Sequence, residues 1–198
     1  MVPVLTSLPV ILRPPRNGDA EDRFRIGLVP EFILMCGGDP KPAATYTEAD
    51  ARTWYEHRMA DSCGWCIEVS GRCIGHARLH SLDTENRRAR YAIGIFDPSA
   101  WGLGYGTLAT RLVIGYAFEV LHLHRVDLRV LAYNARAIAC YRRCGFIQEG
   151  IERDAALIGG HWYDDVIMSM LEAEYRAAEL DLDESDGALA GHKPDTYQ

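Results

Sequence analysis

Apolar and polar residues alternate most regularly over residues 125–130. Val126, Leu128 and Val130 would share one face of a strand, and the charged residues between them would share the other. A different spacing occurs over 104–121, where apolar residues recur every three or four positions, as on one face of a helix. The inward positions of that helix would be Leu108, Leu112, Ile114 or Val113, Ala117 and Leu121. The chain therefore combines half-buried strands with amphipathic helices.

Strand-like and helix-like segments follow one another along the first 170 residues or so. Thr47 is placed to cap a helix, Ser70-Gly71 to turn a hairpin, and Gly145 to end a helix. We expect strands at 4–13, 64–69, 72–81, 88–96, 125–130, 146–153 and 162–170. We expect helices from Asp19 to about Val29, from Thr47 to about Ala60, over 104–121 and from Asn134 to Gly145, with a loop at 30–46.

This order of elements predicts an α+β (mixed α/β) fold with a mixed sheet flanked by helices. The strand–helix–strand unit over 88–130 should contribute a parallel pair, because parallel neighbours need a long crossover connection. The total of 198 residues suits one domain. Apolar residues make up 48% of the chain, which is enough for a globular core.

Charge and hydropathy exclude several classes of protein. The formal charge is −7, and residues 179–198 contribute most of it, with six carboxylates against Lys193. We therefore expect a folded domain over 1–178 and an acidic, disordered tail over 179–198. A nearly neutral domain is atypical of nucleic-acid binding. No apolar run is long enough to cross a membrane, and the first residues resemble a strand more than a signal peptide, so we expect a cytoplasmic protein.

Six cysteines have two interpretations. Cys63-x-x-Cys66 and the pair Cys140 and Cys144 could together hold zinc. Without an export signal, reduced cysteines that pack as small hydrophobic residues are the simpler interpretation. We therefore expect no metal.

The segment Trp101-Gly102-Leu103-Gly104-Tyr105-Gly106-Thr107 lies between a predicted strand and a predicted helix. Glycines let a ligand approach the backbone, and the free amides of the first helical turn can bind an anion. No Gly-Lys-Ser/Thr follows, so the segment is not a Walker loop, and Thr107 stands where a dinucleotide fingerprint needs Gly or Ala. The segment alone is equally compatible with a tight structural turn.

The surrounding motifs add a family resemblance. The glycine segment resembles the acyl-CoA loop Arg/Gln-x-x-Gly-x-Gly/Ala of the GCN5-related N-acetyltransferases (GNAT), with Trp101 in place of the usual Arg or Gln. Its sequence, Trp-Gly-x-Gly-Tyr-Gly-Thr, is similar to the corresponding loop in the subgroup of ribosomal-protein N-terminal acetyltransferases. The resemblance covers about residues 10–176. Further matches are Tyr116-Ala-Phe118 with Leu121, Arg125-Val126, Asn134-Ala-Arg-Ala137-Ile-Ala-Cys-Tyr141, Cys144-Gly-Phe146, Glu149-Gly150, Arg153, Asp164-Asp165 and Met168.

The resemblance implies a mostly antiparallel seven-stranded sheet with one splayed parallel pair and about four flanking helices. It also implies acetyl-CoA as co-substrate. The donor would contact the backbone near Ile95 and Phe96, where the splay opens, and the turn from Trp101 to Thr107. Asn134 would cap its helix, and the resemblance implies that its side chain also contacts CoA.

Acetyl transfer to an amine needs a neutral amine, a donor to the developing oxyanion and an acid for the departing thiolate. By its place in the motif, Tyr141 is the expected acid; the alternative is that it only packs helix against sheet. The general base stays open among Asp83, Glu85, Asp97, His76, His80 and a water molecule. Many relatives carry a Glu on the strand where this chain has Arg90-Tyr91-Ala92-Ile93.

The expected function is direct transfer of acetyl from acetyl-CoA to a primary amine in a ternary complex. A protein N-terminus, a metabolite and an amino-bearing antibiotic remain open as acceptors, and Glu31, Asp39, Trp54 and Trp162 could line their pocket. The alternative from another class is a non-catalytic acyl-CoA sensor. A homodimer is a family-level expectation only, and neither nucleic acid nor a membrane is an expected partner.

Overall fold

A computed structural model describes residues 2–40 and 46–178. The predicted acidic tail therefore lies outside the described residues. The strands are β1 (Leu5–Ser7), β2 (Val10–Arg13), β3 (Gly64–Val69), β4 (Arg72–Asp83), β5 (Arg88–Ile95), β6 (Arg125–Leu131), β7 (Ile147–Ile158) and β8 (His161–Leu171). The helices are α1 (Gly18–Ile26), α2 (Pro30–Met35), α3 (Glu48–Ala60), α4 (Tyr105–Gly115) and α5 (Ala135–Arg143). A 3-10 turn covers Pro98–Ala100, a π-helical turn covers Tyr116–Val120, and residues 172–178 are helical.

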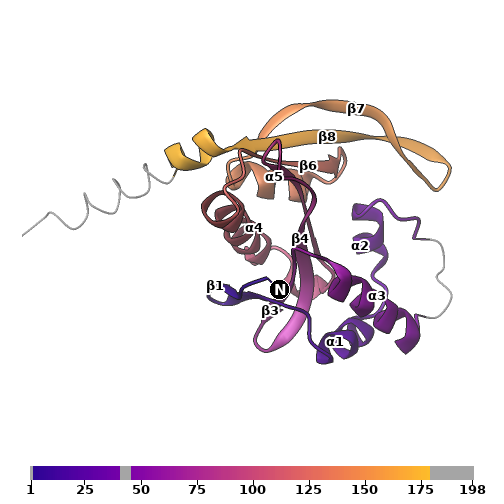
Figure 1. The fold of residues 1–198 in the computed structure, drawn as a ribbon. Coiled ribbons are helices and arrows are strands. Elements are labelled where there is room, and N and C mark those ends of the chain that lie inside the picture. The colour runs from indigo at the N-terminus through magenta and orange to yellow at the C-terminus, as the bar shows by residue number, and fades with distance from the viewer. Residues whose placement is uncertain (1, 41–45, 179–198) are drawn as a thin grey trace, which may run out of the picture.

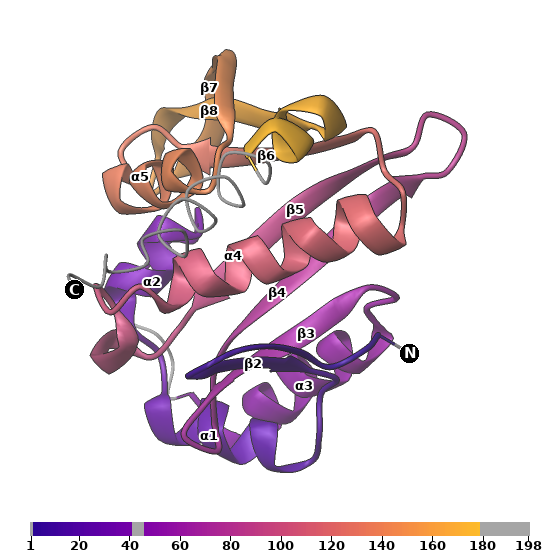
Figure 2. The same ribbon diagram turned by 90° about the vertical axis from the view of Figure 1, so that its left-hand side faces the viewer.

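All eight described strands form one sheet in the order β1-β2-β3-β4-β5-β6-β8-β7. Every neighbouring pair is antiparallel except β5 and β6, which are joined through α4. Helix α4 crosses one face of the sheet, and α1, α2 and α3 lie against the other (Figures 1 and 2). The predicted mixed fold with one parallel pair is confirmed.

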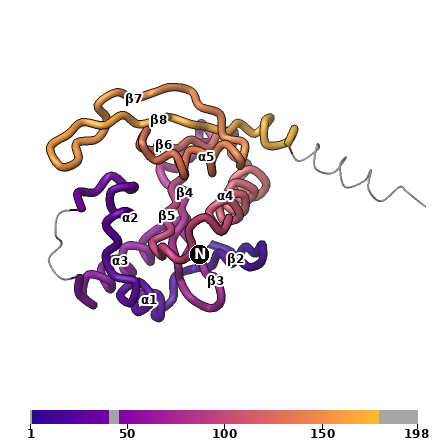
Figure 3. The backbone as a smooth tube through the Cα atoms, turned by 180° about the vertical axis from the view of Figure 1, so that it is seen from behind, coloured from indigo at the N-terminus to yellow at the C-terminus, as the bar shows by residue number. Residues whose placement is uncertain are grey.

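The main core lies between α4 and the sheet. Val113, Ala117 and Phe118 are fully buried there, together with Leu12 and Val126 from the strands. The hairpin of β7 and β8 forms the far edge of the sheet, which the backbone trace shows from behind (Figure 3).

Three predictions about the N-terminal third were wrong. The strand expected over 4–13 is two short strands, because the chain folds back at Leu8-Pro9 and pairs Leu5 with Leu12. The sheet therefore has eight strands and not seven. The loop expected at 30–46 contains α2, which begins at a proline, a residue well suited to the first helical position.

The helix expected to start at Asp19 begins at Gly18 instead, so the Asp19 side chain does not cap it. Its fully buried carboxylate accepts hydrogen bonds from the Arg13 guanidinium at 2.9 and 2.6 Å and from the Arg16 amide at 2.7 Å. The residue therefore ties α1 to β2, because a buried carboxylate must be paired. Thr47, in contrast, caps α3 as predicted and forms a capping box with Asp50.

Candidate active site

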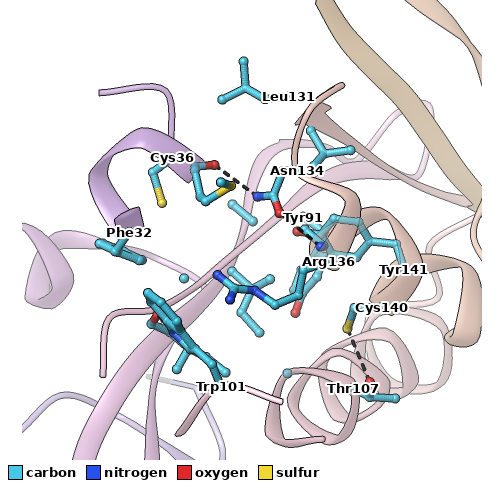
Figure 4. Close-up of a pocket in the computed structure, with 18 of the residues that line it drawn as sticks. Phe32, Cys36, Tyr91, Trp101, Thr107, Leu131, Asn134, Arg136, Cys140 and Tyr141 are labelled. Carbon is cyan, nitrogen blue, oxygen red and sulfur yellow. Dashed lines mark hydrogen bonds between the residues drawn. The ribbon is translucent and has the colours of Figure 1, made fainter. Parts of the chain in front are cut away.

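The parallel strands β5 and β6 pair only over Arg88–Arg90 and Arg125–Asp127. Beyond these residues no ladder joins the two strands, although β5 runs on to Ile95 and β6 to Leu131. A cleft of about 920 Å³ lies here, lined by both strands and by α2, α4 and α5. Figure 4 shows its lining side chains. The predicted splay is therefore present, but it starts at Tyr91, three residues before the Gly94–Phe96 segment expected from the sequence.

The glycine turn forms one wall of the cleft. Gly102 and Gly104 have φ values of +76° and +84°, a region that favours glycine, and Gly104 is the N-cap of α4. No side chain caps this helix, and the Thr107 amide donates to the Gly104 carbonyl at 3.0 Å. The amides of Tyr105 and Gly106 at the positive end of α4 are therefore suited to an anion.

Trp101 is fixed at the end of β5. Its indole N–H donates to the Ile95 carbonyl at 2.8 Å. The Arg136 guanidinium from the first turn of α5 lies 4.2 Å from the centre of the indole ring and 3.3 Å from the Glu31 carboxylate (Figure 4). The Arg136 guanidinium that packs on Trp101 therefore lies next to the glycine turn. The family pattern has Arg or Gln, a cation or an amide, at the position of Trp101.

The sequence did not single out Arg136. Its place two residues after the Asn134 cap, in the first turn of a helix that faces the glycine turn, was the available signal. Among the predicted donor-site residues, Ile95, Trp101, Gly102, Gly104, Tyr105, Gly106, Thr107 and Asn134 line the cleft.

Two predicted donor-site residues do not line the cleft. Phe96 is fully buried in a small cluster with Cys66 and Cys73, and its amide donates to the Ile74 carbonyl at 3.0 Å. Leu103 is 58% exposed and is not among the cleft-lining residues. Each of these residues is the chain neighbour of a cleft-lining residue. Successive side chains of an extended chain face opposite sides, which explains why Phe96 and Leu103 do not line the cleft.

Asn134 caps α5, as predicted, by accepting a hydrogen bond from the Ala137 amide at 3.1 Å. The side-chain NH₂ of Asn134 donates to the Met35 carbonyl at 3.2 Å, and the neighbouring Tyr133 hydroxyl donates to the Leu34 carbonyl at 2.6 Å. Asn134 therefore holds α2 against the start of α5. Its contact with CoA stays a prediction.

Tyr141 lies on α5 and lines the cleft, with its ring packed edge-on against Tyr91 and Phe146. Burial raises the pKa of its hydroxyl well above the usual value, so the phenol is protonated near neutral pH. Tyr91 differs, because its hydroxyl donates to Thr110 at 3.0 Å. Tyr141 can therefore act as a proton donor inside the cleft.

Two cysteines of α5 face the glycine turn. The Cys140 sulfur lies 3.4 Å from the Thr107 hydroxyl and lines the cleft (Figure 4). Hydrogen bonding from the Cys144 thiol, with Thr107 and Arg143 nearby, lowers the pKa of the Cys140 thiol below its usual value. Among the described residues, the one group with metal-like spacing is Asp19, Cys66 and Cys73, and Asp19 is already bound to Arg13. The two cysteine pairs considered from the sequence as an alternative zinc site do not come together in this way.

Of the five side chains proposed as general base, His76 lines the cleft. Asp83 accepts hydrogen bonds from Asn86 in a turn, Asp97 accepts from Ser99, and His80 contacts Ser81. Glu85 is exposed in the same turn as Asp83. Burial and the nearby Arg58, Arg78 and Arg23 lower the pKa of His76 to about 3, so the imidazole is neutral near pH 7.

None of the acceptor-side residues named from the sequence lines the cleft, although Glu31 and Trp54 each contact a residue that does, Arg136 and His76 respectively. Glu31, Asp39, Trp54 and Trp162 are not among the cleft-lining residues. Trp54 packs against Phe96 at 5.4 Å between ring centres, and Trp162 is 58% exposed on β8. Phe32, Met35 and Cys36 from α2 and its end form that wall instead.

The sequence profile of the acetyltransferase (GNAT) domain matches residues 10–147. The chain belongs to the GNAT acetyltransferase family. Its relatives in this family include YdaF of Bacillus subtilis (strain 168), named as a ribosomal N-acetyltransferase. YdaF is 36% identical over 146 residues, which cover 72% of this chain and 78% of the relative.

A second relative, the spermidine N(1)-acetyltransferase of Escherichia coli (strain K12), is 32% identical over 111 residues, which cover 56% of this chain and 59% of that protein. The spermidine N-acetyltransferase of Vibrio cholerae, solved with CoA and spermine, has the same fold. It superimposes with a TM-score of 0.71 at 23% identity, covering 85% of this chain and 99% of that one. The protein is thus an acetyl-CoA-dependent N-acetyltransferase.

Proposed function

We propose that the protein moves acetyl from acetyl-CoA to the primary amine of a small molecule or a protein N-terminus by direct attack in the cleft between β5 and β6. The observation that carries this proposal is the cleft itself, which the glycine turn and Tyr141 both line. An anion site and a proton donor therefore share one cavity of about 920 Å³.

The donor end fits a diphosphate. The first-turn amides of α4 and the Arg136 guanidinium would bind it, because a helix N-terminus and a nearby cation both favour negative charge. Phosphate binding at the turn would direct the rest of the donor along the open edge of β5 towards Tyr141.

The chemistry would proceed in one ternary complex. The neutral amine attacks the thioester carbon, the new C–N bond forms, and the C–S bond then breaks. Tyr141 donates its proton to the departing CoA thiolate, and the ammonium proton of the adduct passes to His76, directly or through water. The products are the acetylated amine and CoA thiol.

His76 is the proposed proton acceptor because, among the side chains considered as general base, it is the one that lines the cleft, beside the open part of β5. It pairs across the sheet with Gly94, so its ring has no side chain opposite. Phe32 packs against the same glycine, which brings α2 to the place where the acceptor would enter.

The test is Tyr141→Phe, assayed by mass spectrometry of the acetylated product so that the protein's own thiols do not interfere. We expect kcat to fall about 100-fold with unchanged CoA affinity, since a general acid contributes roughly 10²–10⁴-fold. Tyr55→Phe is the matched control, because Tyr55 lies on α3 and its hydroxyl contacts Asn17.

Unchanged turnover in Tyr141→Phe would remove the acid role. Tight CoA binding with no product from a broad range of amines would instead support the acyl-CoA sensor.

A further inference from the structure

The acceptor side of the cleft holds polar nitrogen atoms that lack partners. Among the described residues, His76 Nδ1 and Arg78 Nε are buried and have no hydrogen-bond partner. Both residues line the cleft. A buried polar nitrogen without a partner is costly, so a pair of such atoms at one site favours a ligand with polar groups: an oxygen for the Arg78 guanidinium and an amine for the neutral imidazole of His76.

The charges around these atoms favour an anion. Arg78 donates to Asp61 at 3.1 Å, and Arg58 lies 3.3 Å from the same carboxylate. Two guanidinium groups thus share one carboxylate, which leaves a net positive charge beside His76. Asp61 does not itself line the cleft.

The rest of the cleft has the same sign. Its charged lining residues are Arg78, Arg129, Arg136, Arg143 and Asp165. Two carboxylates outside the lining pair with two of these arginines, Glu152 with Arg129 at 2.6 Å and Glu31 with Arg136 at 3.3 Å, so the excess positive charge comes from Arg78 and Arg143. Asp165 is the one carboxylate among the described lining residues, and burial together with Glu152 raises its pKa, which makes it a weaker anion. Such a lining repels a polycation, because like charges in a partly desolvated site are unfavourable.

The spacing of the two residues sets the size of the ligand. His76 and Arg78 are two positions apart on one face of β4, about 7 Å along the strand. Their neighbours across the sheet are Gly94 and Ala92, so small side chains form the floor between them. An acidic group at Arg78 and an amine beside His76 would therefore belong to one small molecule.

We propose that the acceptor is a carboxylate-bearing amine of amino-acid size, whose carboxylate is bound by Arg78 and whose amino group lies beside His76. This inference rests on the proposed acetyl transfer and names its acceptor class. The bound carboxylate would also change the basicity of His76. Because it offsets the positive charge of Arg58 and Arg78, the imidazole takes up a proton more easily once the acceptor is bound.

The experiment compares leucine, phenylalanine and methionine with their carboxamides, with spermidine and with a peptide that is amidated at its C-terminus. Each is assayed as an acceptor by mass spectrometry. For the wild-type protein we expect kcat/KM for the free acids to exceed that for the carboxamides by about 10- to 100-fold, the range for a charge-assisted hydrogen bond. This comparison needs no variant and is independent of folding.

The variant Arg78→Gln should abolish the preference for the acid mainly through KM, and Arg78→Lys should restore part of it. The control is Arg90→Gln, because Arg90 lies on β5, pairs with Asp127 at 3.0 Å and does not line the cleft. It should keep the wild-type preference, and thermal unfolding of each variant verifies that it is folded.

Equal turnover of acids and carboxamides, or a preference for spermidine or for the peptide, would overturn this inference and leave acetyl transfer intact. An undiminished preference for the acid in a folded Arg78→Gln protein would overturn the assignment of Arg78. Bound CoA with no acetylated product from any of these amines would overturn the inference and the proposed function together.

Discussion

At the scale of single residues, Trp101 and Arg136 replace one side chain of the family pattern with two. The indole is anchored to the Ile95 carbonyl, and the guanidinium lies on its face at 4.2 Å. A cation on an indole ring is stabilised by the ring electrons and loses part of its freedom to move. The pair can therefore supply the positive charge that tryptophan alone lacks.

Arg136→Gln should weaken CoA binding about three- to tenfold, as expected for a half-exposed ionic contact. Calorimetry with CoA at low and high salt measures the effect, and the difference from wild type should shrink at high salt. Arg142→Gln is the control, since Arg142 lies on the same helix and contacts Gln148. An equal loss of CoA affinity in both variants would mean that Arg136 has no specific role in binding CoA.

At the scale of elements, the two glycines nearest the start of α4 have different reasons to be glycine. Gly104 has a φ of +84°, whereas a Cβ on Gly106 would make ordinary contacts of 3.6 Å with Ile95 and 3.7 Å with Cys140. Gly104 therefore needs the backbone freedom of glycine, whereas Gly106 does not. This agrees with the family pattern, which accepts either Gly or Ala at the position of Gly106.

Gly104→Ala should therefore destabilise the protein by about 1–2 kcal/mol and weaken CoA binding. Gly106→Ala should retain both stability and affinity, because alanine favours the helix. Denaturant unfolding and calorimetry on the two variants measure these effects. A stable Gly104→Ala protein with normal affinity would show that the bent turn is not what binds the donor.

Three strands at the edge of the sheet are joined by one ionic contact. Arg125 on β6 donates to both oxygens of Glu149 on β7 at 2.6 and 2.5 Å, and Ser169 on β8 donates to the same carboxylate at 2.8 Å. Arg125, with Ser169, lowers the pKa of Glu149 to about 2 from its usual value of 4.5.

A lowered pKa in the folded state makes the ionised form stabilising. The contribution of Glu149 is complete above about pH 4.5 and is lost as the pH falls towards 2. Between pH 5 and pH 3, the wild type should lose more unfolding free energy than Glu149→Gln, by up to about 1 kcal/mol, since the carboxylate is partly exposed and screened. If urea unfolding gave the same loss of unfolding free energy for the wild type and Glu149→Gln, the contact between Arg125 and Glu149 would contribute nothing to stability.

Local sequence signals predicted most elements but not the acceptor side. The alternation over 125–130 gave β6, and Asn134 gave the cap of α5, because both signals are contained in a few neighbouring residues. The cluster of Arg58, His76 and Arg78 was not predicted. It depends on how α3 packs on β4, which residues far apart in the chain decide.

At the scale of the whole molecule, helices cover both faces of the sheet near the cleft, whereas the hairpin of β7 and β8 projects from one edge (Figure 1). Four apolar side chains of β7 and β8 are more than half exposed, namely Ile147, Ile151, Leu157 and Trp162. No helix within the described ranges is long and apolar enough to cross a membrane. Exposed apolar groups of this kind are frequent at protein contacts.

The homodimer remains a prediction, and this hairpin is the surface we expect it to use. Light scattering after size-exclusion chromatography should give twice the mass of the chain for the wild type. Trp162→Glu should shift the protein towards the monomer, because a charge would be buried in an apolar contact. A monomeric wild type would exclude the dimer at the concentrations tested.

The paired strands β4 and β5 beside the cleft limit how this enzyme can be redesigned, through Gly94, which lines the cleft, and Gly75, which does not. A Cβ on Gly75 would lie 2.4 Å from the Gly94 carbonyl, and one on Gly94 would lie 3.1 Å from Phe32 and 3.3 Å from His76. Selection for new acceptors therefore has little freedom along β4 and β5 at this level. Variation would have to come from α2 and its C-cap. A library at Phe32, Met35 and Cys36 should therefore yield altered substrate ranges, whereas one at Gly75 should yield misfolded chains.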